Sequence, residues 1–126
     1  MGAAFTRKRG PHIKIKALIP KSEKKIIIVP DSGSSVNLVS GTNCRDWGIS
    51  VESLEPGEGH LFDIQGCLIP VLGRANIDIF LPSRGISASV SVRVVDVPSL
   101  EGLVVGWEAL QSSYIFAFNL KSVISF

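Results

Sequence analysis

Cysteine and histidine are scarce in this chain. Its 126 residues include two cysteines, Cys44 and Cys67, and two histidines, His12 and His60. Two cysteines at this spacing form neither a disulfide framework nor a metal-ligand pattern, so we interpret them as free thiols in a reducing compartment. The histidines lie in no His-Glu-x-x-His motif, and we expect surface or structural roles for both. The sequence therefore predicts no metal site and no cofactor.

Long apolar segments are also missing. No run of residues approaches the length that spans a membrane, and residues 1–16 lack the apolar core of a secretory signal. There is no Asn-x-Ser/Thr glycosylation site either. These absences predict an intracellular protein without membrane contact.

Charge is concentrated at the start of the chain. The first 25 residues contain eight basic side chains and one acidic side chain, Glu23, and carry a net charge of +7, whereas the remaining residues carry −5. The basic residues are Arg7, Lys8, Arg9, Lys14, Lys16, Lys21, Lys24 and Lys25. A basic segment of this kind can contact nucleic acid or a membrane surface. Phe5 is the only aromatic residue among them, so no stacking platform for bases is expected, and we predict a solvated leader over residues 1–10.

The rest of the composition is typical of a single globular domain rich in strands. Hydrophobic residues make up 45% of the chain and charged residues 19%. A chain of this length can bury a core without disulfides or metals. β-Branched residues recur throughout, and glycine and proline punctuate the chain, which favours strands over helices. We assign residues 11–126 to one domain.

Alternation of polar and apolar residues predicts the strands. Residues 12–18, 74–80 and 86–97 alternate in this way, which is typical of half-buried strands. Residues 25–29 form a β-branched run that predicts a buried strand ending at Pro30. Residues 60–64 and 67–72 flank Gln65-Gly66, which predicts a hairpin with a glycine turn.

Three further segments complete the prediction. Residues 43–47 are expected to form a short helical turn ending at Gly48, and residues 51–59 an acidic loop. Residues 103–106 are an apolar strand that runs into a helix over residues 107–112. Short strands are expected at residues 114–118 and 122–126. About seven or more short strands with frequent turns predict an all-β sandwich or barrel.

Asp31-Ser32-Gly33 is the segment in which chemistry is most concentrated. Aspartate, serine and glycine favour turns, so the tripeptide by itself is also compatible with an ordinary turn. Here an apolar strand precedes it and an apolar segment follows it directly. Gly33 allows a close approach of a second backbone, and Ser32 offers a hydroxyl that can bond across a symmetric interface. These are the parts needed for two carboxylates that share one proton.

At this point the sequence resembles the retropepsins, the homodimeric aspartic proteases of retroviruses and LTR retrotransposons. Three blocks carry the resemblance: the strand, Asp-Ser-Gly and apolar continuation over residues 26–39, the glycine-tipped hairpin over residues 63–71, and the strand-to-helix block over residues 103–110. They occur in the family's order and spacing. The residues from 116 to 126 are similar to the terminal hairpin of retrotransposon members.

The resemblance implies a closed, barrel-like all-β acid-protease fold with a flap hairpin and one short C-terminal helix. It implies a homodimer, because only one Asp-Ser-Gly occurs in the chain. Asp31, Ser32 and Gly33 would be the catalytic loop. The predicted substrate-binding residues are Ser34, Ile64, Gln65, Gly66, Leu103, Val104 and Val105.

The implied activity is that of an aspartic endopeptidase that cleaves polyprotein peptide bonds with a water held between two copies of Asp31. The implied partners are a second copy of the chain and a peptide or polyprotein substrate, with no metal, no membrane and no nucleic acid at the core domain. The implied location is the cytoplasm or the interior of virus-like particles.

Other functions were weighed against this one. A catalytically weak or inactive module for dimerisation or peptide binding, in a domesticated or cellular protein, stays open, as does an active cellular member of the ubiquitin-shuttle type. No Gly-x-Ser-x-Gly motif supports a serine hydrolase. Residues 56–59 lack the lysine of a phosphate loop, and a plain turn is expected there. Cys67 near the predicted flap could make activity redox-sensitive, but a small apolar role is the simpler interpretation.

Overall fold

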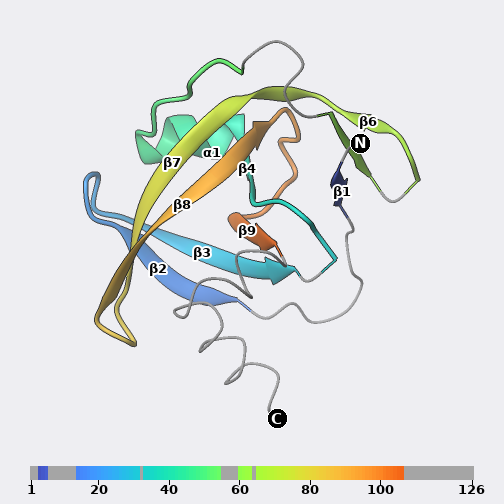
Figure 1. Ribbon diagram of the computed structural model, residues 1–126. Coiled ribbons are helices and arrows are strands. Elements are labelled where there is room, and N and C mark those ends of the chain that lie inside the picture. The colour runs from blue at the N-terminus through green and yellow to red at the C-terminus, as the bar shows by residue number, and fades with distance from the viewer. Residues whose placement is uncertain (1–2, 6–13, 32, 55–59, 64, 107–126) are drawn as a thin grey trace.

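The computed structural model describes residues 3–5, 14–31, 33–54, 60–63 and 65–106. Six strands close into a barrel in the order β2-β3-β9-β4-β8-β7, and three form a separate small sheet in the order β1-β5-β6 (Figure 1). The barrel strands are β2 (Ile15–Ile19), β3 (Lys24–Asp31), β4 (Leu38–Ser40), β7 (Val71–Leu81), β8 (Ile86–Val95) and β9 (Leu103–Gly106). The small sheet consists of β1 (Ala3–Phe5), β5 (Leu61–Asp63) and β6 (Leu68–Ile69). The prediction of an all-β barrel is confirmed.

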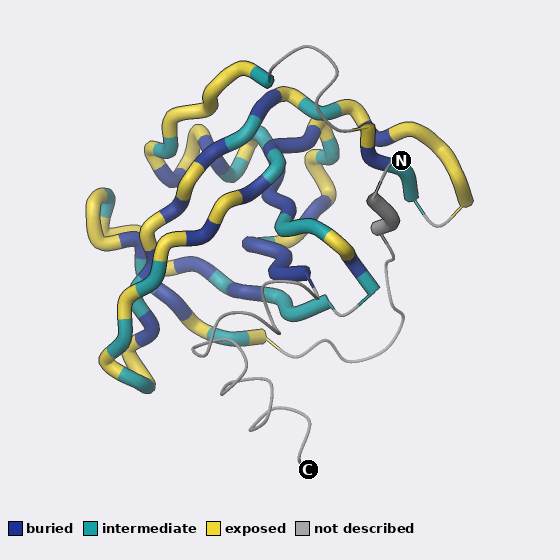
Figure 2. The backbone as a smooth tube through the Cα atoms, viewed as in Figure 1, coloured by how far each residue is buried: buried dark blue, intermediate teal, exposed yellow. Residues whose placement is uncertain are grey.

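The long hairpin of β7 and β8 shows how alternation builds this barrel. The two strands pair antiparallel, with Ala75 opposite Val92 and Ile77 opposite Val90. All four of these side chains are buried, whereas the neighbouring Asn76 and Ser91 are exposed (Figure 2). Successive side chains of a strand point to opposite faces, so the apolar face lines the barrel interior and the polar face meets water.

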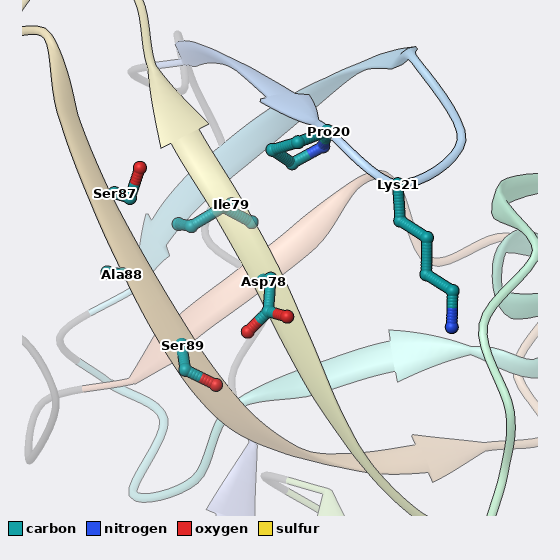
Figure 3. Close-up of a pocket in the computed structure, with 7 residues that line it drawn as sticks. All are labelled: Pro20, Lys21, Asp78, Ile79, Ser87, Ala88 and Ser89. Atoms are coloured by element: carbon teal, nitrogen blue, oxygen red, sulfur yellow. The ribbon is translucent and has the colours of Figure 1, made fainter.

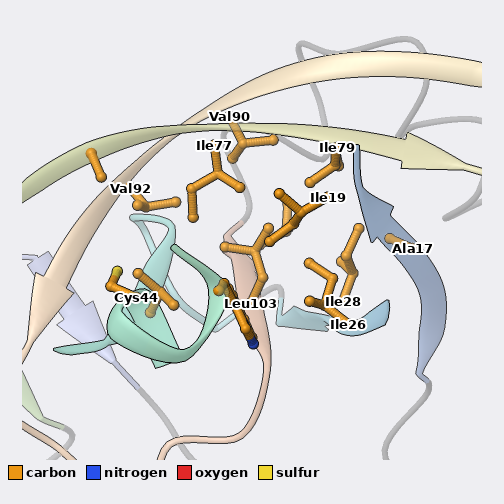
Figure 4. Packing of buried hydrophobic residues seen from close by; sticks show 14 of the residues in the cluster. Ala17, Ile19, Ile26, Ile28, Cys44, Ile77, Ile79, Val90, Val92 and Leu103 are labelled. Atoms are coloured by element: carbon orange, nitrogen blue, oxygen red, sulfur yellow. The ribbon is translucent and has the colours of Figure 1, made fainter. Parts of the chain in front are cut away.

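Apolar side chains fill the barrel interior in one main cluster (Figure 4). Ile28, Ile77, Ile79 and Leu103 are at most 1% exposed. A second, smaller cluster joins Leu38, Leu61, Ile69, Val95, Leu100 and Val104. Leu61 and Ile69 come from β5 and β6, so this second cluster attaches the small sheet to the barrel.

Strand β3 lies inside the barrel wall between two partners. It pairs antiparallel with β2 and parallel with β9, with Ile28 opposite Leu103 and Asp31 opposite Gly106. Strand β9 in turn meets β4 at Leu38 and Val104. Ile26 and Ile28 on one face are buried, and Ile27 and Val29 on the other face are half-buried. The β-branched run fits a strand that is largely covered on both faces.

The one helix of the described residues is α1 (Gly41–Trp47). The Ser40 hydroxyl oxygen accepts a hydrogen bond from the Asn43 N–H at 3.0 Å and caps the helix, and Gly48 ends it in the left-handed conformation with φ 71°. The predicted helical turn over residues 43–47 is confirmed and starts two residues earlier, at Gly41, directly after its serine cap. No helix among the described residues has the length and apolar character needed to cross a membrane.

Some boundaries differ from the prediction for clear reasons. The single strand expected over residues 67–72 is divided by Pro70, which has no N–H to donate to a ladder, into β6 and the start of β7. Ala3–Phe5, within the predicted leader, forms β1 and pairs in parallel with β5. The predicted C-terminal helix and the strands after it lie outside the described residues.

Candidate active site

Asp31 is the last residue of β3, and the barrel fixes its position. Its neighbour across the sheet is Gly106, the last residue of β9. Because the two strands run parallel, they end together at the same edge of the barrel. Asp31 is half-buried at this edge, so its carboxyl group is held by the barrel wall and still has access to solvent.

The loop after Asp31 folds back on the aspartate. The Gly33 N–H donates a hydrogen bond to Asp31 Oδ1 at 2.9 Å, and the Ser34 N–H donates to the Asp31 carbonyl oxygen at 3.1 Å. The first contact is the local bond that aspartate makes to its own backbone in turns. It orients the carboxylate relative to the loop. Ser32, predicted to support the catalytic loop, lies outside the described residues.

The end of β9 packs tightly against this loop. A Cβ atom placed on Gly106 would lie 2.6 Å from the Val36 carbonyl oxygen and 2.7 Å from that of Ser34. Real Cβ atoms essentially never approach backbone oxygens this closely, so only glycine fits here. The third sequence block therefore needs glycine at position 106, because the backbone of β9 passes very close to the backbone of the loop after Asp31.

Asn37 ties the same loop to two strands, and we did not single it out from the sequence. Its Oδ1 accepts the Gly106 N–H at 2.8 Å, and its Nδ2 donates to the Ser91 carbonyl oxygen at 2.9 Å. Its own carbonyl oxygen accepts the Arg93 N–H at 2.9 Å. The available signal was an amide side chain within an otherwise apolar segment, which indicates backbone groups that need a partner.

The hairpin predicted on either side of Gln65-Gly66 is formed by β5 and β6, with Leu61 opposite Ile69 and Phe62 opposite Leu68. At its tip, Asp63 Oδ1 accepts the N–H groups of Gln65 and Cys67, both at 2.9 Å. Gly66 takes a positive φ of 83°, which glycine adopts without strain. Gln65 and Gly66 are exposed, and Ile64 lies outside the described residues.

Hairpin and aspartate lie on the same side of the barrel. In Figure 1 the β5–β6 hairpin projects from the barrel on the side toward which the arrowhead of β3 points. The small sheet and the Asp31 loop therefore flank one region of the surface. We place the candidate active site in this region.

Four predicted substrate-binding side chains lie in the interior. Leu103 and Val105 are 0% exposed, Val104 is 4% exposed and Ser34 is 1% exposed. The Ser34 hydroxyl donates to the Val36 carbonyl oxygen at 2.6 Å, within the loop itself. Little of their surface is open to a ligand. Leu103, Val104 and Val105 pack in the two core clusters beneath the site. Direct substrate contact by them stays a prediction.

The two free thiols differ in environment. Cys44 is a buried residue of α1, and desolvation raises the pKa of its thiol to about 11, whereas Cys67 is exposed at the hairpin. The described residues contain no group of three histidine, cysteine, aspartate or glutamate side chains that could hold a metal ion.

A shallow hollow on the outer face of the β7–β8 hairpin lies apart from this region. It has a volume of about 510 Å³ and is lined by residues such as Lys21, Asp78 and Ser89 (Figure 3). The close-up shows the Asp78 and Ser89 side chains next to each other on neighbouring strands. Asp31 does not line it, so it is separate from the candidate active site.

Solved structures with a similar fold include aspartic proteases and a protease-like domain. An inhibitor complex of EIAV protease superimposes with a TM-score of 0.58 at 15% identity, covering 85% of this chain and 92% of that one. The retroviral protease-like domain of Ddi1 from Leishmania major gives 0.56 at 14% identity, covering 81% and 75%. A retropepsin-like aspartic protease from Rickettsia conorii gives 0.53 at 15% identity, covering 83% and 74%.

The sequence comparisons find no such similarity. No protein-family model matches the chain, and no curated protein matches it significantly. With identities of 15% and below, the likeness to the solved structures is one of fold.

Proposed function

We propose that this chain, which has the retropepsin-like fold expected from its sequence, supplies half of the active site of a homodimeric aspartic endopeptidase. The observation that carries the proposal is the placement of Asp31. It lies at the barrel edge, its carboxylate is oriented by the Gly33 N–H, and its loop is supported by Gly106. A hairpin with an exposed tip lies on the same side.

A complete site needs two such loops. The sequence contains one Asp-Ser-Gly, so the second carboxylate comes from a second copy of the chain. A two-fold axis beside Asp31 would bring the two loops together with the same residues on each side. The half-buried position of Asp31 at the barrel edge leaves it accessible to such a partner.

The proposed chemistry uses the two carboxylates in different protonation states. The ionised copy of Asp31 takes a proton from a water, which then attacks the scissile carbonyl carbon. The protonated copy donates a hydrogen bond to the carbonyl oxygen without losing its proton, and it transfers that proton to the leaving nitrogen when the C–N bond breaks. Ser32 of each chain would bond the opposite loop and hold the pair, and no metal takes part in this scheme.

The substrate would be a peptide in extended conformation, such as a segment of a polyprotein. It would lie between the hairpin and the barrel edge, where main-chain hydrogen bonds give affinity and side-chain pockets give selectivity. Gln65 and Gly66 lie at the tip of the hairpin, together with Ile64 in our prediction. Leu68, which is 59% exposed, adds an apolar contact surface on the same hairpin.

Replacement of the aspartate tests the proposal. We expect Asp31→Asn to lower the cleavage rate of a denatured protein or a peptide panel at mildly acidic pH by at least about 100-fold, because both the base and the acid are removed. Thermal unfolding should change little. The matched control is Asp78→Asn, which changes an exposed carboxylate on β7 and should leave the rate unaltered.

An inhibitor separates the enzyme from an inactive module with the same fold. A statine-type mimic of the tetrahedral intermediate should block cleavage, because it occupies the site better than the substrate does. Activity that survives both the mimic and Asp31→Asn would contradict the dyad. A folded, dimeric wild type that cleaves nothing would favour the alternative of a dimerisation or peptide-binding module.

A further inference from the structure

A long groove lies beside β2, at the opposite end of β3 from Asp31. Its volume is about 1160 Å³, and it is lined by residues 14–18, 25–27 and 82–84. The strands that line it, β2 and β3, lie beside the turn between β7 and β8 at the lower left of Figure 1. Pockets for small molecules typically measure roughly 300–1,000 Å³, so this groove has the size for a peptide segment.

The groove exists because a strand ladder stops. Strand β2 pairs with β7 at Leu18 and Phe80, and continuing this antiparallel register would place Lys16 opposite Pro82. Proline has no N–H and cannot extend a ladder, so β7 ends at Leu81 and the chain turns away. The two strands therefore separate, and the space between them is the groove.

Among the described residues, this separation leaves one edge of β2 without a partner strand. From Ile15 to Ala17 the strand pairs with β3 on one side. On its other side, no strand of the described part of the chain continues the pairing past Leu18. An open strand edge presents backbone N–H and C=O groups to which another extended segment can add.

The lining side chains favour an acidic ligand. Ile15, Leu18 and Ile27 are half-buried and give an apolar surface, while Lys16 and Lys25 are exposed. Lys14 and Arg84 also line the groove, and none of its lining residues, all within the described part of the chain, is acidic. Lys14 already binds a carboxylate, that of Glu101, at 2.6 Å between Nζ and Oε1. The site thus combines apolar contact with positive charge.

We propose that this groove binds an extended, acidic segment of another polypeptide, which adds as a strand to the open edge of β2. Alternate side chains of a strand face opposite sides. In a segment that alternates apolar and acidic residues, the apolar side chains lie on the face of Ile15 and Ala17, and the carboxylates lie on the opposite face, which carries Lys16 and Lys25. The binding does not involve Asp31 and is independent of peptide cleavage.

The test is a binding titration on the whole chain with Asp31→Asn, so that cleavage cannot interfere. The probe is a fluorescein-labelled octapeptide that alternates valine with glutamate. Its binding is measured by fluorescence anisotropy. We expect saturable binding, weakened at least about tenfold when the glutamates are replaced by glutamine. The double variant Lys16→Glu, Lys25→Glu should lose binding to a similar degree.

A matched control and a structural readout make the result specific. Lys21→Glu, Lys24→Glu makes the same change of net charge at exposed lysines outside the groove, and it should retain the affinity within about twofold, because screening weakens distant charges. Hydrogen exchange should show slower amide exchange at residues 15–17 when the peptide is bound.

Three outcomes would overturn the proposal. The first is equal affinity of the two charge-reversed variants, and the second is bound peptide without protection at residues 15–17. The third is tighter binding of a single-stranded oligonucleotide than of the peptide at the same salt concentration, which would assign these basic residues to nucleic acid.

Discussion

Gly106 is the residue on which the geometry of the Asp31 loop depends most directly. Two backbone carbonyl oxygens, of Val36 and Ser34, lie where its side chain would be. Backbone atoms in the barrel wall move less readily than the end of a flexible side chain. A methyl group at this position therefore has to displace the loop or separate it from β9.

We expect Gly106→Ala to lower the free energy of unfolding by about 1–3 kcal/mol, the range of overpacked interiors, and to lower any activity of Asp31 as well. Urea denaturation measures the first effect. Gly41→Ala is the matched control, because its new methyl group would meet the end of the Leu72 side chain instead. Equal stability losses in both variants would contradict a special role for the close backbone contact at Gly106.

The buried thiol of Cys44 makes the free energy of unfolding fall as the pH rises in the alkaline range. Burial raises the pKa of its thiol from 9.0 to about 11, so the folded chain holds this proton more tightly than the unfolded chain does. The resulting stabilisation is complete below pH 9 and is lost as the pH rises toward 11. Two pH units correspond to about 3 kcal/mol at most.

Stability curves between pH 8 and about pH 11 check this. The fall in unfolding free energy over this range should be smaller in Cys44→Ala than in wild type, whatever the absolute stability of the variant. Cys67→Ala, at an exposed thiol, should retain the wild-type fall. If the two curves have the same slope, the buried thiol is not the cause.

Asn37 shows what sequence reasoning misses at the scale of a residue. The Asp-Ser-Gly loop and the glycine of residues 103–106 were recognised because short patterns mark them. The role of Asn37 depends on Gly106 and Ser91, which are 69 and 54 residues away. No local pattern reports such contacts, although a polar side chain in an apolar segment is a reason to look for them.

At the scale of elements, the β5–β6 hairpin is organised by Asp63. Its carboxylate accepts two N–H groups at the tip, those of Gln65 and Cys67. Neither bond joins the tip to the barrel. Loss of the carboxylate should therefore loosen the tip while the barrel keeps its stability.

We expect Asp63→Ala to speed amide exchange at Gln65 and Cys67 and to lower kcat/KM by about tenfold, because a loose tip orders the substrate less well. The melting temperature should shift by only about a degree or two. Asp46→Ala, at an exposed position of α1, serves as the comparison. Unchanged exchange at the tip would show that other contacts hold the hairpin.

Elements whose signal is local were predictable. The alternation of β7 and β8, the buried run of β3, the helix before Gly48 and the hairpin at Gln65-Gly66 all follow from periodicity or turn chemistry. The division of residues 67–72 into two strands at Pro70 could have been predicted from the sequence, but we expected a single strand there. The parallel pairing of β1 with β5 could not, because parallel partners need no turn or spacing that marks them.

For the whole molecule, the central expectation is that activity requires two chains. Specific activity should fall on dilution, as the dimer dissociates. Sedimentation at several concentrations, with and without the statine-type mimic, should show the mimic shifting the chain toward the dimer. Without the mimic, the dimer dissociation constant of Asp31→Asn should agree with that of wild type within about threefold. The two-chain site would be contradicted if the rate stayed proportional to protein concentration on dilution while sedimentation showed only a species of monomer mass.

The order of strands in the barrel is the part of the whole fold that local patterns could not supply. Alternation indicates that a segment is a strand and which residues face inward. It does not say that β9 lies between β3 and β4, or that β8 and β4 run parallel. The family resemblance supplied the closed barrel, because it compares the complete order of blocks.

The pairing of β3 with β9 also has a consequence for synthesis of the chain. Asp31 leaves the ribosome long before Gly106, its neighbour in the sheet. At roughly 5–20 residues per second, several seconds pass in which the aspartate exists without the strand that positions it. A nascent chain that ends before Gly106 has the aspartate but not its support, so the fold itself delays any chemistry at Asp31 until translation has passed β9.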